Sequence, residues 1–192
     1  QSEGTNIKSW RWNFGDGGTS SATNPSHTFT SGGTFTVQLT ATGTGGSNTT
    51  SQTVNILAPP TKCYIKKVYI VAIPWTDGSG AGWDSYNGPD LYYNIENYGG
   101  TVYHTESANW FTDAVQSDLP ISWTFNSPYL LISNLSEDLY FGIFDHDSPD
   151  ADDFIGWSSP IKLSTYTTYP TSITKTNTSN GVTVKIDIQW SN

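Results

Sequence analysis

The sequence predicts an all-β protein made of two consecutive sandwiches of antiparallel strands. The 192-residue chain is rich in threonine, serine and aromatic residues and holds 18 glycines and 10 prolines, a composition that favours strands and tight turns. Short segments alternate apolar and polar residues, as in Val-Thr-Val-Lys-Ile-Asp-Ile at residues 182–188, which is typical of a strand with one wet face. No segment of helical length repeats apolar residues every three to four positions.

A pair of prolines divides the chain. Pro59 and Pro60 stand in the segment 58–61, and consecutive prolines stiffen a connection and cannot donate hydrogen bonds to a sheet. We therefore place one module at residues 1–57 and a second at residues 62–192. The strands predicted in the first module are residues 9–14, 34–42 and 51–56.

The first module resembles a known family. The resemblance rests on Trp-Arg-Trp-Asn-Phe-Gly-Asp-Gly at residues 10–17, Asn-Pro-Ser-His-Thr-Phe at residues 24–29 and Gly-Thr-Phe-Thr-Val at residues 33–37. These motifs are similar to those of the polycystic kidney disease (PKD) domain. The resemblance implies an immunoglobulin-like β-sandwich over residues 1–57, of the kind that acts as a spacer or adhesion module on exported proteins.

The family normally has one or two strands before the tryptophan strand, and this sequence has almost no room for them. We therefore expect one sheet of the first module to lack a strand and to expose unpaired backbone groups. A shortened chain explains the gap. The alternative is that a neighbouring subunit donates the strand, which would make the protein a self-assembling subunit of an extracellular filament or surface layer.

The second module has longer and more aromatic apolar segments than the first. Their alternation and the turn residues between them predict eight strands. The predicted strands are residues 63–73, 90–97, 101–106, 121–125, 129–133, 138–144, 154–163 and 182–190.

Aspartates are concentrated in this second module. Residues 145–153 contain five aspartates directly after a predicted strand, with no lysine or arginine nearby in the sequence. Asp84 lies in the long glycine-rich loop of residues 75–89, and Asp90 directly follows that loop and starts a predicted strand. Crowded carboxylates repel one another unless a positive charge lies among them, and Ca²⁺ prefers six to eight oxygen ligands. The pattern predicts a calcium site, and the alternative is a solvated acidic turn.

Residues 62–192 resemble a C2 domain, a calcium-dependent membrane-binding β-sandwich. The similar segments are residues 88–95, residues 119–125 and residues 144–156, which run from Phe-Asp-His-Asp to Asp-Phe-Ile-Gly. The last segment is similar to the family's third calcium loop, and we name it the third acidic loop. Residues 75–90, which correspond to the family's first loop, are named the first acidic loop. The resemblance implies an eight-stranded antiparallel sandwich of type-II topology that binds two calcium ions, and it assigns no role to Asp150 and Asp152. The implied calcium ligands are Asp84, Asp90, Asp145, Asp147 and Asp153.

Charge and motif content exclude several classes of function. A net charge of -9, with eight lysines plus arginines against 17 aspartates plus glutamates, argues against nucleic-acid binding. No apolar run is long enough to be a transmembrane segment, and Gln1 at the start suggests a processed piece of an exported protein. Cys63 is expected to be a buried thiol. No catalytic triad, zinc spacing or phosphate loop occurs, so we expect no enzyme activity.

The sequence therefore predicts a non-catalytic, secreted or cell-surface, calcium-binding module with a structural or adhesion role. One alternative is a calcium-dependent accessory region of a secreted hydrolase that docks to carbohydrate or anionic lipid. In that alternative Trp75, Trp83 and Tyr86 of the first acidic loop would insert or stack. The other alternative is the strand-donating assembly described above.

Overall fold

The computed structural model of the protein describes residues 6–77, 79–83, 88–147 and 151–192. The chain divides into two compact units, Gln1–Pro59 and Pro60–Asn192, and the division falls within the proline segment 58–61. The described residues form fourteen strands and two single-turn 3-10 helices, with no α-helix among them, so the all-β prediction is confirmed. They include no helix with the length and apolar character needed to cross a bilayer.

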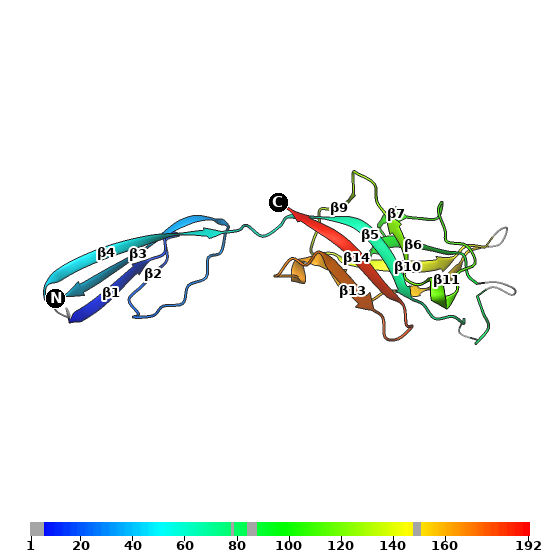
Figure 1. The fold of residues 1–192 in the computed structure, drawn as a ribbon, viewed down its shortest axis with the longest axis horizontal. Helices are drawn as coiled ribbons and strands as arrows, with labels where there is room; N and C mark the ends of the chain where they lie inside the picture. The colour runs from blue at the N-terminus through cyan, green and yellow to red at the C-terminus, as the bar shows by residue number, and fades with distance from the viewer. Residues whose placement is uncertain (1–5, 78, 84–87, 148–150) are drawn as a thin grey trace. The chain divides into compact units, whose positions relative to one another are not determined.

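The first unit contains one antiparallel sheet of four strands in the order β2-β1-β3-β4 (Figure 1). A two-residue turn joins its two long strands, since Gly43 pairs with Gly46. The strands are β1 (Ile7–Asn13), β2 (Thr19–Ser20), β3 (Gly33–Gly43) and β4 (Gly46–Ile56). A second sheet that would complete a sandwich is not found among residues 6–59.

Aromatic rings hold the first unit together. Phe14, the one buried hydrophobic residue among residues 6–59, stacks on His27 with 3.9 Å between ring centroids. Phe29 lies edge-on to His27 and stacks on Phe35. The Nε2 atom of His27 lies 2.7 Å from Oδ2 of Asp16, and this hydrogen bond, with that from the Gly18 amide, lowers the pKa of Asp16. The segment between β2 and β3 is thereby fixed against the sheet.

β4 forms an edge of this sheet. It is eleven residues long, most of its residues are exposed, and it pairs with β3 on one side. Long exposed edge strands are templates for pairing with another chain. Strand donation therefore stays a prediction, and this edge offers a place for it.

The second unit is a sandwich of two antiparallel sheets with ten strands in its described residues (Figure 1). One sheet has the order β11-β10-β6-β7, with β12 paired to β10, and the other has the order β13-β14-β5-β8, with β9 paired to β5. The strands are β5 (Lys62–Ala72), β6 (Leu91–Asn97), β7 (Val102–Thr105), β8 (Ile121–Thr124), β9 (Leu130–Ile132), β10 (Asp138–Asp145), β11 (Asp153–Trp157), β12 (Ile161–Lys162), β13 (Ser172–Thr176) and β14 (Thr183–Ser191). The 3-10 turns are η1 (Gln116–Asp118) and η2 (Leu163–Thr165).

The core lies between these two sheets, and strand alternation supplies it. Along β10, Leu139, Phe141 and Ile143 are fully buried, as period-two alternation requires. In β5 the buried positions change from Cys63 and Ile65 to Val68 and Ile70. The register against β14 shifts at this point, because a bulge inserts one extra residue and reverses which positions face inward.

Two strand predictions for this unit were wrong. The single strand expected at residues 154–163 is two strands, β11 and β12, because Pro160 lacks the N–H group that would continue the ladder. The strand β13 was not predicted, and eight expected strands became ten. Ile173 is the one strongly apolar residue of β13, which leaves little periodicity to detect at a sheet edge.

Cys63 provides a test of the core. Its side chain is fully buried, and burial raises the pKa of its thiol to about 12. Since the thiolate is the reactive form, we expect native protein at pH 8 to react with a maleimide far more slowly than protein in guanidinium. Labelling followed by mass spectrometry checks this, and equal rates in the two conditions would contradict the described packing.

Candidate metal centre

Three strands of one sheet meet at the end of the sandwich that carries the aspartates. Asp145, the last residue of β10, is paired in register with Leu91 at the start of β6 and with Asp153 at the start of β11. Asp90 therefore lies beside β10, one residue before β6. The pairing brings together two loops that are far apart in the sequence.

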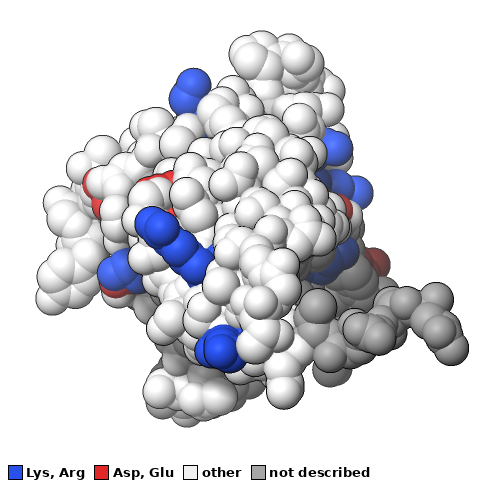
Figure 2. Space-filling view, turned by 90° about the vertical axis from the view of Figure 1, so that its left-hand side faces the viewer, with Lys and Arg blue, Asp and Glu red and all other residues white. Residues whose placement is uncertain are grey.

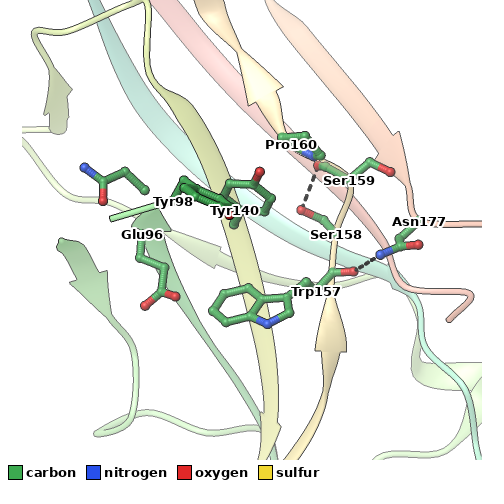
Figure 3. Close-up of a pocket in the computed structure, with 9 residues that line it drawn as sticks. Glu96, Tyr98, Tyr140, Trp157, Ser158, Ser159, Pro160 and Asn177 are labelled. Atoms are coloured by element: carbon green, nitrogen blue, oxygen red, sulfur yellow. Dashed lines mark hydrogen bonds between the residues drawn. The ribbon is translucent and has the colours of Figure 1, made fainter. Parts of the chain in front are cut away.

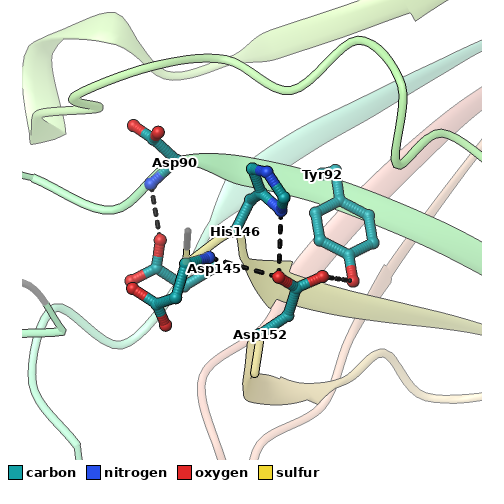
Figure 4. A network of polar contacts seen from close by, with 6 residues as sticks. Asp90, Tyr92, Asp145, His146 and Asp152 are labelled. Atoms are coloured by element: carbon teal, nitrogen blue, oxygen red, sulfur yellow. Dashed lines mark hydrogen bonds and ion pairs between the residues drawn. The ribbon is translucent and has the colours of Figure 1, made fainter. Parts of the chain in front are cut away.

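Asp145 is the centre of this arrangement. It is a buried charged residue, with 0% of its surface exposed. Its Oδ1 accepts a hydrogen bond of 2.6 Å from the backbone N–H of Asp90, and the N–H of His146 donates to the carbonyl oxygen of Asp90 at 2.8 Å. These bonds tie the two acidic loops to each other, and Figure 4 shows the one between Asp90 and Asp145.

A third segment, which the sequence analysis missed, fixes Asp90 from its other side. The N–H of Asp113 donates to Oδ1 of Asp90 at 2.7 Å, and backbone bonds join Leu91 to Phe111 in both directions. The two segments approach so closely that a Cβ on Gly88 would lie 1.8 Å from the carbonyl oxygen of Ala114. Asp113 has a positive φ of 51°. In the sequence its neighbours are uncharged and it belongs to no recognised motif, so the sequence analysis did not select it.

Asp152 now has a role. The hydroxyl of Tyr92 donates to its Oδ2 at 2.6 Å, Nδ1 of His146 lies 2.9 Å from its Oδ1, and the N–H of Asp147 donates to the same oxygen at 3.2 Å (Figure 4). Desolvation raises the pKa of Asp152, but the hydrogen bonds from Tyr92, His146 and Asp147 outweigh it and lower that pKa. The charged carboxylate thus holds the start of the third acidic loop.

The structure brings four of the five predicted ligands to one end of the sandwich. They are Asp90, Asp145, Asp147 and Asp153, while Asp84 lies outside the described residues, as do Asp150 and Tyr86. The donor set fits Ca²⁺ chemically, because every side chain in it offers carboxylate oxygens. The described residues nevertheless contain no group of three or more potential ligands placed to hold an ion. For Asp90 the reason is visible in Figure 4, where its carboxylate is turned away from Asp145.

Two tryptophans of the first acidic loop pack against the sandwich. Trp75 and Trp83 are partly buried against the core, and Nε1 of Trp83 donates to the carbonyl oxygen of Pro74 at 2.8 Å. In this arrangement both side chains stabilise the loop.

The charge distribution agrees with an acidic protein that lacks a basic platform. On the face shown in Figure 2, lysine and arginine side chains form small separate groups. Lys66 and Lys67 lie near the rings of Tyr129 and Tyr69, respectively. Lys185 also lies over the Tyr69 ring, so these three lysines pack against tyrosine rings.

Comparison with known proteins found similarity in the first unit. Residues 1–58 match the PKD domain family. Over 53 residues the chain is 43% identical to Collagenase ColA of Bacillus cereus, a match that covers 28% of this chain and 6% of the collagenase. The PKD resemblance is thus confirmed for the first unit. The C2 resemblance of residues 62–192 stays a prediction.

The Asp152 network generates a prediction on stability. Replacing Tyr92 with phenylalanine removes the donor to Oδ2 of Asp152 and leaves a charge-assisted hydrogen bond unmade, so the free energy of unfolding should fall by about 1 to 2 kcal/mol. Urea denaturation of the second unit measures this. Tyr64→Phe is the matched control, because no hydrogen bond joins the Tyr64 hydroxyl to the described residues. Equal stability of Tyr92→Phe and wild type would refute the network.

Proposed function

We propose that the protein is a non-catalytic extracellular module with a structural or adhesion role. In this proposal, Ca²⁺ is held by the aspartates of two loops at one end of a C2-like sandwich of type-II topology. The observation that carries the proposal is the fully buried carboxylate of Asp145 at the point where β6, β10 and β11 meet, with Asp90 and Asp153 beside it.

The physical case rests on charge. Removing a carboxylate from water is unfavourable unless hydrogen bonds or opposite charge offset the loss of hydration. Asp90, Asp147, Asp152 and Asp153 add further negative charge around Asp145. A divalent ion would supply positive charge at this position and restrain both acidic loops, which is a structural role suited to millimolar extracellular calcium.

The residues divide naturally into ligands and supports. Asp145 and Asp147 would contact the ion from the third acidic loop, Asp90 and Asp84 from the first, and Asp153 from the start of β11. Asp113 and Asp152 would act as supports, because each is bonded to the backbone or side chain of a ligand loop. Two ions remain our expectation for the full set of aspartates.

The absence of catalysis is part of the proposal. Cys63, the one cysteine, is a poor nucleophile, because it is fully buried and the pKa of its thiol is raised to about 12. The aspartates lie close together with several bonded to backbone amides. Acid–base chemistry on glycosides instead needs one neutral and one charged acid on either side of a cleft.

The location follows from the comparisons. The PKD match and the similarity to a region of a collagenase support an extracellular module. What such a module would attach to is not named by either comparison.

The calcium site predicts a metal-dependent stability. Thermal melting of the full chain should show that calcium raises the midpoint of the second unit, that excess chelator reverses the shift, and that magnesium at equal concentration has a smaller effect. At ten times the dissociation constant the stabilisation should be about 1.4 kcal/mol.

The matched variants are Asp145→Asn with Asp147→Asn, which should abolish the shift, and Asp138→Asn, which should keep it. Asp138 begins the same strand at its other end. Identical melting curves of the wild type in calcium and in chelator would rule out the proposed site.

A further inference from the structure

The outer face of one sheet carries a row of aromatic rings. β10 directs Tyr140 and Phe144 outward, on the face opposite its buried residues. Ring centroids are 6.4 Å apart for Tyr98 and Tyr140, 6.4 Å for Tyr140 and Trp157, and 5.1 Å for Trp157 and Phe154. The solvent-facing side of an antiparallel sheet is ordinarily polar, so this row requires an explanation.

A hollow lies at one end of the row (Figure 3). Its volume is about 440 Å³, and Tyr98, Tyr140 and Trp157 provide its aromatic walls. The side chain of Tyr98 is 89% exposed, which is unusual for a large ring that serves packing alone. Glu96 and Asn177 contribute polar groups to the same hollow.

Gly142 makes room for the aromatic row. A Cβ at this position would lie 2.7 Å from Cζ3 of Trp157 and 3.0 Å from Cε2 of Phe144. Glycine therefore allows both rings to lie close to the sheet. The nearest atom to such a Cβ is Oδ1 of Asn94, at 2.4 Å, so a side chain here would have to displace Asn94 as well as the Trp157 indole.

The polar groups of the hollow are of two kinds. Those of Ser158, Ser159 and Asn177 are already bonded, to Ser159, Thr176 and Trp157 backbone carbonyls, respectively. The indole N–H of Trp157 and the carboxylate of Glu96 are more available for hydrogen bonds to a ligand. Trp157 Nε1 donates to no described residue, and Glu96 accepts one long bond of 3.5 Å from Asn94. A ligand would thus meet the Trp157 N–H, the hydroxyls of Tyr98 and Tyr140 and the Glu96 carboxylate between aromatic surfaces.

We propose that this hollow binds a neutral oligosaccharide. Pyranose rings present apolar C–H faces that pack on aromatic planes, and hydroxyls at their edges that donate to a carboxylate and accept from an indole N–H. The lining contains no lysine or arginine, and the chain has a net charge of -9, so anionic ligands are repelled. A purely apolar ligand would leave Glu96 desolvated without a partner.

This binding site is separate from the calcium site. Glu96 lies near the end of β6 and Tyr140 near the start of β10, whereas Asp90 precedes β6 and Asp145 ends β10. The two sites therefore occupy opposite ends of the same strand pair. Saccharide binding would need no metal, and it goes beyond the structural role proposed above.

The test is calorimetric titration of the full chain, in excess chelator, with soluble tetrasaccharides of β-linked glucose, N-acetylglucosamine and xylose. At least one should bind, and Tyr98→Ala should weaken that binding about tenfold, as expected for an aromatic anchor. Because Tyr98 is almost fully exposed, its replacement should leave the fold intact. Trp157→Phe is the second variant, and it should weaken binding by removing the N–H donor.

Tyr129→Ala, in the turn between β8 and β9 of the other sheet, is the control and should bind like wild type. Failure of all three sugars to bind at millimolar concentration would overturn the proposal. Equal binding by Tyr98→Ala and wild type would also overturn it. A dimer in equilibrium sedimentation that Tyr98→Ala dissociates would assign the face to a second copy of the chain instead. Because chelator is present throughout, none of these outcomes depends on the calcium site.

Discussion

The pairing of β6, β10 and β11 places a fully buried carboxylate at the end of a sheet, and the account of the second unit depends on it. Asp145 is buried because it is the last residue of a central strand, with neighbours on both sides. Its bond to the Asp90 backbone and the bond from His146 to Asp90 then join the two acidic loops. A change in the charge of the Asp145 carboxylate therefore affects both loops.

The same strand pair also separates the two proposed sites. Alternation along β10 sends Leu139, Phe141 and Ile143 into the core and leaves Tyr140 and Phe144 on the outer face. Metal chemistry is confined to the strand end, where backbone groups and aspartates meet, and the aromatic surface extends towards the opposite end. A rigid sandwich with a separate ligand surface suits an accessory module, since neither site needs the other to form.

Sequence patterns predicted the features that depend on local alternation or on dense motifs. The all-β class, most strands of the second unit and the PKD match of residues 1–58 belong to this group. Features that depend on tertiary pairing were missed. Asp113 reaches Asp90 only through the crossing of two distant segments, β13 has a single buried anchor in Ile173, and the outer aromatic row combines residues from two strands and a turn. The role of Asp152 likewise required the position of Tyr92.

The most direct test is a crystal structure of the full chain grown in millimolar calcium, with anomalous diffraction data to identify the ion. The account predicts anomalous density within about 2.3 to 2.6 Å of carboxylate oxygens of Asp145 and Asp147, with the Asp90 side chain rotated towards it. Ordered acidic loops with no ion between them, and with the Asp90 carboxylate still bonded to the Asp113 amide, would contradict the calcium site.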